Sequence, residues 1–152
     1  MNLQEQINRI QSMMKIINEN VECQDDLLID LANILSDKLH CDRYGSCVHF
    51  AELFVELVNE EYPHLLNCFD VIEGYVDWSH GEEIPQQHTW IKLRNGEKID
   101  PTFLQFTKYG NASYRKKNEK TYTGKEYLEN RQIDTWFADR RKKYPEMIFK
   151  NI

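Results

Sequence analysis

Apolar residues recur at steps of three and four through the first part of the chain, which is the pattern of amphipathic helices. The spacing predicts one helix over residues 3–17 and a second from residue 25 or 26 to about residue 39. A third helix should follow residues 40–46 and end before Pro63, because proline disfavours helical geometry in the preceding residue. The faces expected to pack in the core are Leu3, Ile7, Ile10, Met13, Met14 and Ile17, then Leu27, Leu28, Leu31, Ile34, Leu35 and Leu39, and then Phe50, Ala51, Phe54, Val55, Leu57 and Val58.

The period changes after the third helix. Residues 68–78 are rich in β-branched and aromatic side chains and predict a strand. Residues 79–87, with Gly81 and Pro85, are expected to form an exposed loop. A second strand over residues 88–93 and a third that begins at residues 98–100 flank an Asn-Gly turn at residues 95–96, so the two should pair as an antiparallel hairpin that ends at Pro101.

Beyond the hairpin the chain becomes more polar. Residues 107–123 mix lysines and arginine with tyrosines, a composition able to contact a nucleic acid or an acidic partner, but a solvated loop is the favoured interpretation. Residues 124–144 predict a helix whose basic end suits the helix dipole. Its expected inward residues are Tyr127, Leu128, Ile133, Trp136 and Phe137.

Composition narrows the class of protein. A chain of 152 residues with 41% hydrophobic content suits one α+β domain over residues 1–152. The net charge of −6 argues against nucleic acid or an anionic membrane as partner. Residues 1–17 lack a signal-peptide pattern and no apolar run approaches membrane-spanning length, which predicts a cytoplasmic setting. In a reducing compartment the four cysteines, Cys23, Cys41, Cys47 and Cys68, are expected to be free thiols.

Three residues in this framework suggest chemistry. Cys47 begins the third helix, where unpaired N–H groups favour a thiolate. His88 opens one arm of the hairpin and Asp100 ends the other, so pairing about residues 95–96 should bring them together on one face. Taken singly, each has a structural interpretation: Cys47 as a small buried apolar residue, His88 as a histidine at a strand edge and Asp100 as a turn residue before proline. Together they predict a thiol nucleophile, a base and a carboxylate that orients the base.

The order and neighbours of these residues resemble the transglutaminase-like superfamily of papain-type cysteine enzymes over about residues 40–106. The resemblance rests on Cys47 with Phe50, Ala51 and Phe54 on its helix, on Gly74-Tyr75, on His88-Thr89-Trp90 and on Asp100-Pro101-Thr102. It implies Cys47 as nucleophile, His88 as base and acid and Asp100 as orienting carboxylate. It also implies a nucleophile helix packed on a small antiparallel sheet. No cofactor and no metal are expected. Residues 1–39 and 107–152 are helical extensions outside the match.

Several details of such a site stay open. The backbone N–H of Cys47 is the natural first oxyanion donor, with Tyr44, Ser46 or Gln87 as candidates for the second and Trp90 as a cleft residue. A protein or peptide substrate is expected. Proteolysis, deamidation and transamidation are not distinguished, and neither is the oligomeric state. His49 lies two residues from Cys47 on another helix face, so no catalytic role is assigned to it.

Two other functions compete with catalysis. One is a catalytically idle relative that binds a protein or nucleic-acid partner, although such a role gives no reason for the cysteine, histidine and aspartate identities. The other is a metal site at Cys41, Cys47 and His49, joined by His40 and His80. It is the least favoured, because structural zinc sites show two tightly spaced ligand pairs and this sequence has no matching second pair.

Overall fold

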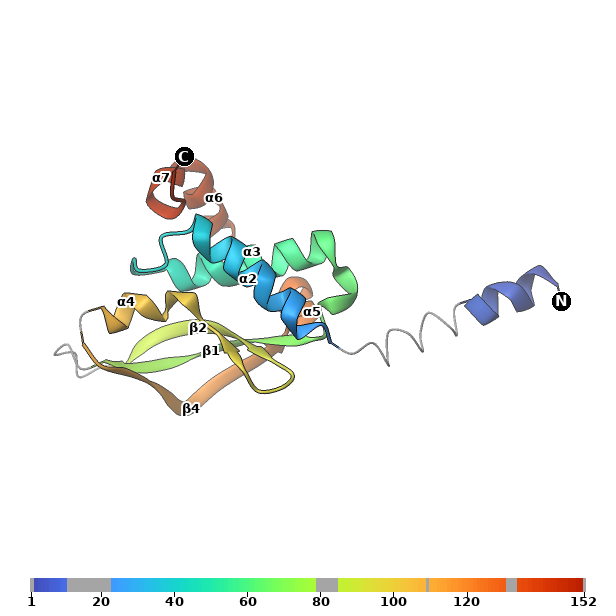
Figure 1. Cartoon of the computed structure of the whole chain (residues 1–152), viewed down its shortest axis with the longest axis horizontal. Helices are drawn as coiled ribbons and strands as arrows, with labels where there is room; N and C mark the ends of the chain where they lie inside the picture. The colour runs from blue at the N-terminus through green and yellow to red at the C-terminus, as the bar shows by residue number, and fades with distance from the viewer. Residues whose placement is uncertain (1, 11–22, 79–84, 109, 131–133, 152) are drawn as a thin grey trace.

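The computed structural model describes residues 2–10, 23–78, 85–108, 110–130 and 134–151. It has an α+β fold, as expected, with helices packed on a four-stranded antiparallel sheet (Figure 1). Residues 3–10 are helical. The further elements are α2 (Asp25–Lys38), α3 (Ser46–Glu61), a 3-10 turn (Pro63–Leu65), β1 (Phe69–Trp78), β2 (Gln86–Leu93), β3 (Lys98–Ile99), a second 3-10 turn (Pro101–Phe103), α4 (Leu104–Thr107), β4 (Ala112–Thr123), α5 (Gly124–Glu129), α6 (Thr135–Lys143) and α7 (Pro145–Ile148).

The sheet has the strand order β3-β2-β1-β4, so the predicted hairpin forms one half of it. β2 pairs with β3 across the Asn-Gly turn, where Gly96 has a φ of 90° that favours glycine. β1 pairs with β2 in a register that sets Gly74 opposite His88. β2 begins two residues earlier than expected, because Gln86 and Gln87 already pair with β1. Residues 79–84 of the expected loop lie outside the described residues.

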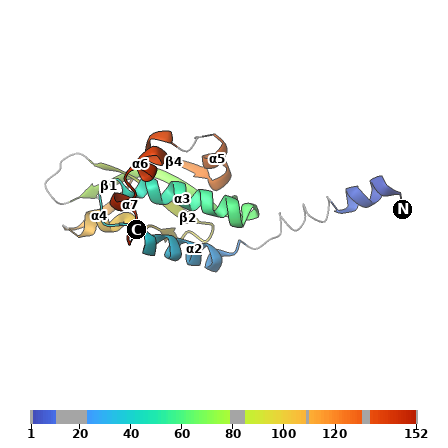
Figure 2. The ribbon, with the colours of Figure 1, turned by 90° about the horizontal axis from the view of Figure 1, so that it is seen from above.

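Helices α2 and α3 cover one face of the sheet, and α6 and α7 lie on the far side of them (Figures 1 and 2). The apolar face predicted for α3 is the centre of the core, where Ala51, Phe54, Val55 and Val58 are fully buried. Phe54 meets Phe69 of β1 edge to face, with ring centroids 5.1 Å apart. Burying each such side chain contributes about 1.5–3 kcal/mol. This packing fixes the start of α3, and with it Cys47, against the sheet.

The expectation of a solvated loop over residues 107–123 is wrong for most of its length. Ala112–Thr123 forms β4, which pairs antiparallel with the edge of β1 that β2 leaves open. Most of its side chains are exposed, including Lys116, Lys117 and Lys120. Lysines on an edge strand discourage pairing with another chain. Backbone pairing holds this strand, which explains why it leaves little trace in the hydrophobic pattern. Tyr109 lies outside the described residues.

The pairing between β1 and β4 is interrupted beside Gly74. Glu73 pairs with Lys120, whereas Tyr75 pairs with Arg115, so residues 116–119 of β4 bulge opposite a single residue of β1. A bulge of this kind redirects side chains and is common next to functional sites. Here it brings Asn118 to a pocket beside the start of α3.

The two ends of the chain differ from the sequence predictions. Leu3, Ile7 and Ile10 of the first helix are 73%, 38% and 57% exposed, so the expected core packing of this face is wrong there. Residues 124–144 form two helices instead of one, α5 and α6. Ile34 and Trp136 were expected to point inward, but both are exposed. Met13, Met14, Ile17 and Ile133 lie outside the described residues.

The prediction of four free thiols is wrong for two of them. Cys23 and Cys68 form a disulfide with Cα atoms 5.2 Å apart, which ties the segment before α2 to the segment before β1. Cys41 and Cys47 are free and buried. Within the described ranges, no helix is both long and apolar enough to cross a membrane.

Candidate active site

Cys47 is the second residue of α3 and is 6% exposed. The residue before the helix, Gly45, has a φ of 84°, a left-handed conformation that turns the chain from the 40–46 segment into the helix. The N–H groups in the first turn of a helix have no acceptor within the helix and carry partial positive charge. The fold therefore places the Cys47 side chain at the positive end of the α3 dipole.

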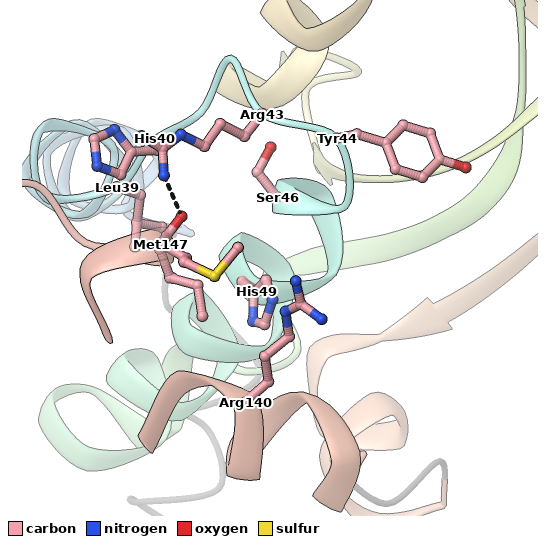
Figure 3. Close-up of a pocket in the computed structure, with 9 residues that line it drawn as sticks. Leu39, His40, Arg43, Tyr44, Ser46, His49, Arg140 and Met147 are labelled. Atoms are coloured by element: carbon pink, nitrogen blue, oxygen red, sulfur yellow. Dashed lines mark hydrogen bonds between the residues drawn. The ribbon is translucent and has the colours of Figure 1, made fainter. Parts of the chain in front are cut away.

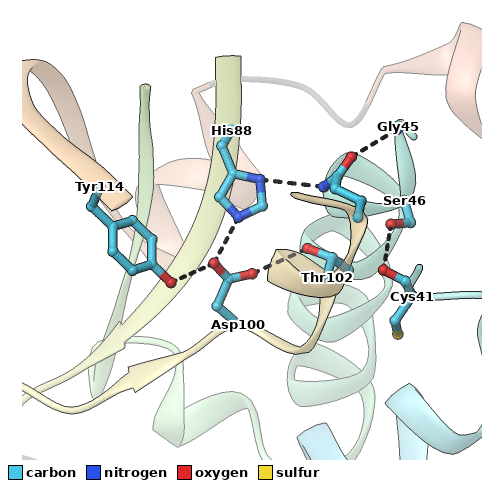
Figure 4. Close-up of polar contacts among 8 residues, drawn as sticks. Cys41, Gly45, Ser46, His88, Asp100, Thr102 and Tyr114 are labelled. Atoms are coloured by element: carbon cyan, nitrogen blue, oxygen red, sulfur yellow. Dashed lines mark hydrogen bonds and ion pairs between the residues drawn. The ribbon is translucent and has the colours of Figure 1, made fainter. Parts of the chain in front are cut away.

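The expectation that His88 and Asp100 meet is confirmed (Figure 4). His88 Nε2 lies 2.6 Å from Asp100 Oδ2, and both side chains are almost fully buried. The other carboxylate oxygen, Oδ1, accepts a hydrogen bond of 3.1 Å from the hydroxyl of Thr102. Both oxygens are thus engaged, which holds the carboxylate in the orientation that receives the histidine N–H.

Tyr114 of β4 is a third partner of the carboxylate. Its hydroxyl donates a 2.6 Å hydrogen bond to the Asp100 oxygen that also faces His88, as Figure 4 shows. Burial and the neighbouring Asp100 charge raise the pKa of the Tyr114 phenol, so it remains a donor. The ring stacks on Phe103 with centroids 4.7 Å apart. Sequence reasoning missed Tyr114 because its segment was interpreted as a loop.

Aromatic rings enclose His88. Trp90 stacks on the imidazole at 5.7 Å, and Phe106 meets it edge to face at 5.1 Å. Burial disfavours the charged ring, but hydrogen bonds and charge interactions with Asp100 and Cys47 outweigh it and raise the pKa of His88 to about 9. Cys47 is close enough to the imidazole to contribute to this rise, and both residues line one cavity. Because Nε2 faces Asp100, Nδ1 is the ring nitrogen that remains for other partners.

Gln105 links the histidine to the start of α3 and was not anticipated from the sequence. Its Oε1 accepts a 3.2 Å hydrogen bond from the Gly45 N–H, and its Nε2 lies 3.5 Å from His88 Nδ1. The side chain is 5% exposed. The one signal in the sequence was a glutamine placed between the apolar residues Leu104 and Phe106. A buried amide of this kind requires hydrogen-bond partners, and here it finds them at the site.

A cavity of about 300 Å³ opens beside this constellation. Cys47 and His88 line it, together with Gln87 on β2 and Gly74 on β1. Asn118, in the bulge of β4, lines the same cavity. The thiol and the imidazole therefore share one space that a substrate can enter.

Of the remaining candidates from the sequence, the structure places two at the site and two away from it. Gln87 lines the cavity, and Trp90 is buried against His88. Tyr44 is 79% exposed, with its hydroxyl 3.4 Å from Gln86 Oε1. The Ser46 hydroxyl donates to the Cys41 carbonyl at 3.2 Å. Tyr44 and Ser46 line another pocket, so the fold does not bring them to the thiol as donors.

His49 and the suggested metal ligands do not assemble into a site. The imidazole of His49 contacts Arg141 and Phe137, on α6. In the described part of the chain, no three His, Cys, Asp or Glu side chains are arranged to hold a metal ion. His80 lies outside the described residues.

Comparison with known proteins adds no relative to this picture. No protein family model, curated protein or solved structure matches the chain. The chemistry must therefore be inferred from the contacts themselves. The imidazole bonds the carboxylate at 2.6 Å and shares a cavity with the thiol, an arrangement suited to activating a cysteine as a nucleophile.

Proposed function

We propose that this protein is a cysteine-dependent acyl-transfer enzyme of the transglutaminase-like type, acting on an amide of a protein or peptide through a thioester. Cys47 is the nucleophile, His88 the general base and acid, and Asp100 the carboxylate that orients the imidazole. One observation carries the proposal: the buried His88 ring bonds Asp100 Oδ2 at 2.6 Å through Nε2 and lines one cavity with Cys47.

The first half-reaction forms the thioester. His88 takes the thiol proton, and the Cys47 sulfur attacks the amide carbonyl carbon while the carbonyl π electrons move to oxygen. When the tetrahedral intermediate collapses, the carbon–nitrogen bond breaks and the imidazolium gives its proton to the departing amine. The Asp100 carboxylate stabilises the imidazolium in this step through the 2.6 Å contact with Nε2. The aromatic rings around His88 exclude water, which strengthens these charge interactions.

The second half-reaction releases the acyl group. The neutral imidazole accepts a proton from water or from an amine as that molecule attacks the thioester carbon. The carbon–sulfur bond then breaks and the Cys47 thiolate is restored next to the imidazolium. Water as acceptor gives proteolysis or deamidation, and an amine gives transamidation.

The developing oxyanion needs hydrogen-bond donors. The Cys47 N–H, in the first turn of α3, supplies the first. For the second, the Gln105 amide is better placed than Tyr44 or Ser46, because its Nε2 is buried 3.5 Å from His88 Nδ1. Gln87 also lines the cavity and is the alternative donor.

The fold around the site supports the same assignment. The helix that begins at the nucleophile packs on an antiparallel sheet, as the resemblance implies. Gly74, from the quoted Gly-Tyr pair, lies opposite His88, and a Cβ at this position would come within 2.7 Å of the Trp90 ring. Glycine here therefore leaves room for the ring that stacks on the histidine.

The experiment that tests the proposal is acylation by p-nitrophenyl acetate, an activated ester that needs no substrate specificity. We expect release of p-nitrophenolate with an acetyl group on Cys47, detected by intact mass and peptide mapping, followed by turnover with water or an added amine. Cys47→Ala and His88→Ala should abolish acylation. Cys41→Ala is the matched control, because it removes the other free buried thiol, and it should acylate normally.

Three outcomes would contradict the proposal. Acylation spread over several nucleophiles, or acylation at Cys47 that persists at full rate in His88→Ala, would show that the imidazole does not activate the thiol. A protein that folds normally yet forms no thioester would instead be the catalytically idle binding module.

A further inference from the structure

A second cavity, of about 210 Å³, lies at the start of α3 (Figure 3). Ser46 and His49, three residues apart and thus on one helix face, form one wall of it. Arg140 of α6 and residues of α7 close the opposite side. Cys47 and His88 do not line this cavity, so the proposed chemistry makes no use of it.

Two arginines line this cavity and bring positive charge to it. Arg43 donates to the Met147 carbonyl at 2.9 Å, and the Arg140 guanidinium lies 5.3 Å from the Trp136 ring centroid. Among the described residues, neither forms a salt bridge with a carboxylate. The acidic neighbour of Arg43 in sequence, Asp42, pairs with Lys108. In a chain of net charge −6, two unpaired cations on one pocket favour an anionic ligand.

His49 adds an N–H donor beside the two arginines, because it lines the same cavity. His49 is only 5% exposed. Its Nδ1 accepts a 3.1 Å hydrogen bond from Arg141. Arginine only donates, so the proton of the neutral ring sits on Nε2. Burial, Arg141 and Arg140 lower the pKa of His49 to about 4, which keeps the ring neutral. Within the described part of the chain, Nε2 has no hydrogen-bond partner, and the residue lines the cavity.

Arg141 itself does not supply the charge that the cavity presents. It bonds Glu52 Oε2 at 2.9 Å with both side chains buried, so its charge is balanced. The same Glu52 accepts from the N–H of Asp134 at the start of α6. These contacts hold α6 against α3, and they keep Arg140 and His49 in place before any ligand arrives.

Leu39, Met147 and Ile148 form the apolar part of the lining, and His40, Tyr44 and Ser46 are its other polar residues. Leu39 and Ile148 are buried, and Met147 is the residue beside Ile148. We propose that this cavity is a binding site for a small organic carboxylate, whose oxygens meet Arg43, Arg140 and the His49 N–H and whose short hydrocarbon chain rests on Leu39 and Ile148. Arginine suits this role because its planar donors match a carboxylate in a bidentate manner.

Titration calorimetry with hexanoate tests the proposal, with hexanamide as a neutral probe of nearly the same shape. We expect hexanoate to bind at least about tenfold more tightly than hexanamide, because charge-assisted hydrogen bonds are roughly twice as strong as neutral ones. Arg43→Gln and Arg140→Gln should each weaken hexanoate about tenfold. Lys142→Gln is the matched control: it removes an exposed cation from α6 that does not line the cavity, and binding should change less than about twofold.

The outcomes separate this site from the proposed enzyme. Equal affinity for hexanoate and hexanamide, or full hexanoate affinity in both arginine variants, would overturn the proposal. Inorganic phosphate binding as tightly as hexanoate would overturn the role of the hydrocarbon chain. Acylation of Cys47 by p-nitrophenyl acetate should remain unchanged in both arginine variants, so loss of hexanoate binding and loss of the thiol chemistry are told apart.

Discussion

Replacing Asp100 by asparagine should slow the alkylation of Cys47 by iodoacetamide near neutral pH. The substitution keeps the size of the side chain and an oxygen that faces His88 Nε2, but it removes the negative charge that lies 2.6 Å from that nitrogen. Without the charge, the imidazolium is less stable. A less stable imidazolium supports less thiolate on Cys47, and the thiolate is the form that reacts.

The size of the effect follows from the pKa of His88, which the site raises from 6.5 to about 9. At about 1.4 kcal/mol for each pKa unit, this rise corresponds to about 3 kcal/mol in favour of the charged ring. Asp100 and Cys47 share the effect. Loss of the carboxylate charge should therefore slow alkylation at pH 7 by between about tenfold and about a hundredfold.

The assay is the rate of carbamidomethylation of each cysteine at pH 7, followed by peptide mass spectrometry. Cys41 is an internal reference, because burial raises the pKa of its thiol to about 11 and it should react slowly in every variant. Thr102→Val is the matched control. It removes the hydrogen bond to Asp100 Oδ1 and leaves the charge, so Cys47 alkylation should change less than about threefold.

One result would refute this reasoning. If Asp100→Asn melts at the wild-type temperature and its Cys47 reacts at the wild-type rate, then the carboxylate does not stabilise a charged His88. A slower reaction accompanied by a large fall in melting temperature would be assigned to unfolding, which is why the melting temperature is measured alongside.

Three further predictions concern stability. In Cys47→Ala protein, the charged His88 ring stabilises the fold fully below pH 6.5, and this contribution declines as the pH rises through the raised pKa of His88. Urea unfolding between pH 6 and 9 should therefore show a falling free energy of unfolding, and a flat profile would contradict the raised pKa. Reducing the disulfide between Cys23 and Cys68, separated by 45 residues, should lower that free energy by up to about 4 kcal/mol, measured by urea unfolding with and without reductant; equal midpoints would argue against the disulfide. Gly74→Ala should displace the buried Trp90, lower stability by about 1–3 kcal/mol and slow Cys47 alkylation; an unchanged melting temperature and rate would count against this close contact.

The sequence by itself determined the elements that depend on residues close together in the chain. Helical periodicity places α2 and α3, Pro63 ends the helical pattern, and the Asn-Gly turn sets the hairpin. The hairpin register depends only on residues close in sequence, which is why the meeting of His88 with Asp100 was predictable. Cys47 at a helix start was visible for the same reason.

Contacts between distant segments were decided by the tertiary structure alone. β4 exists because the edge of β1 was left unpaired, and backbone pairing with that edge needs no hydrophobic alternation in the added strand. Tyr114 reaches Asp100 only through this pairing. Gln105 likewise joins Gly45 across 60 residues of chain, a contact for which no local pattern selects. The packing of the whole core offsets the entropy cost of closing such long loops, so no single stretch of sequence predicts these contacts.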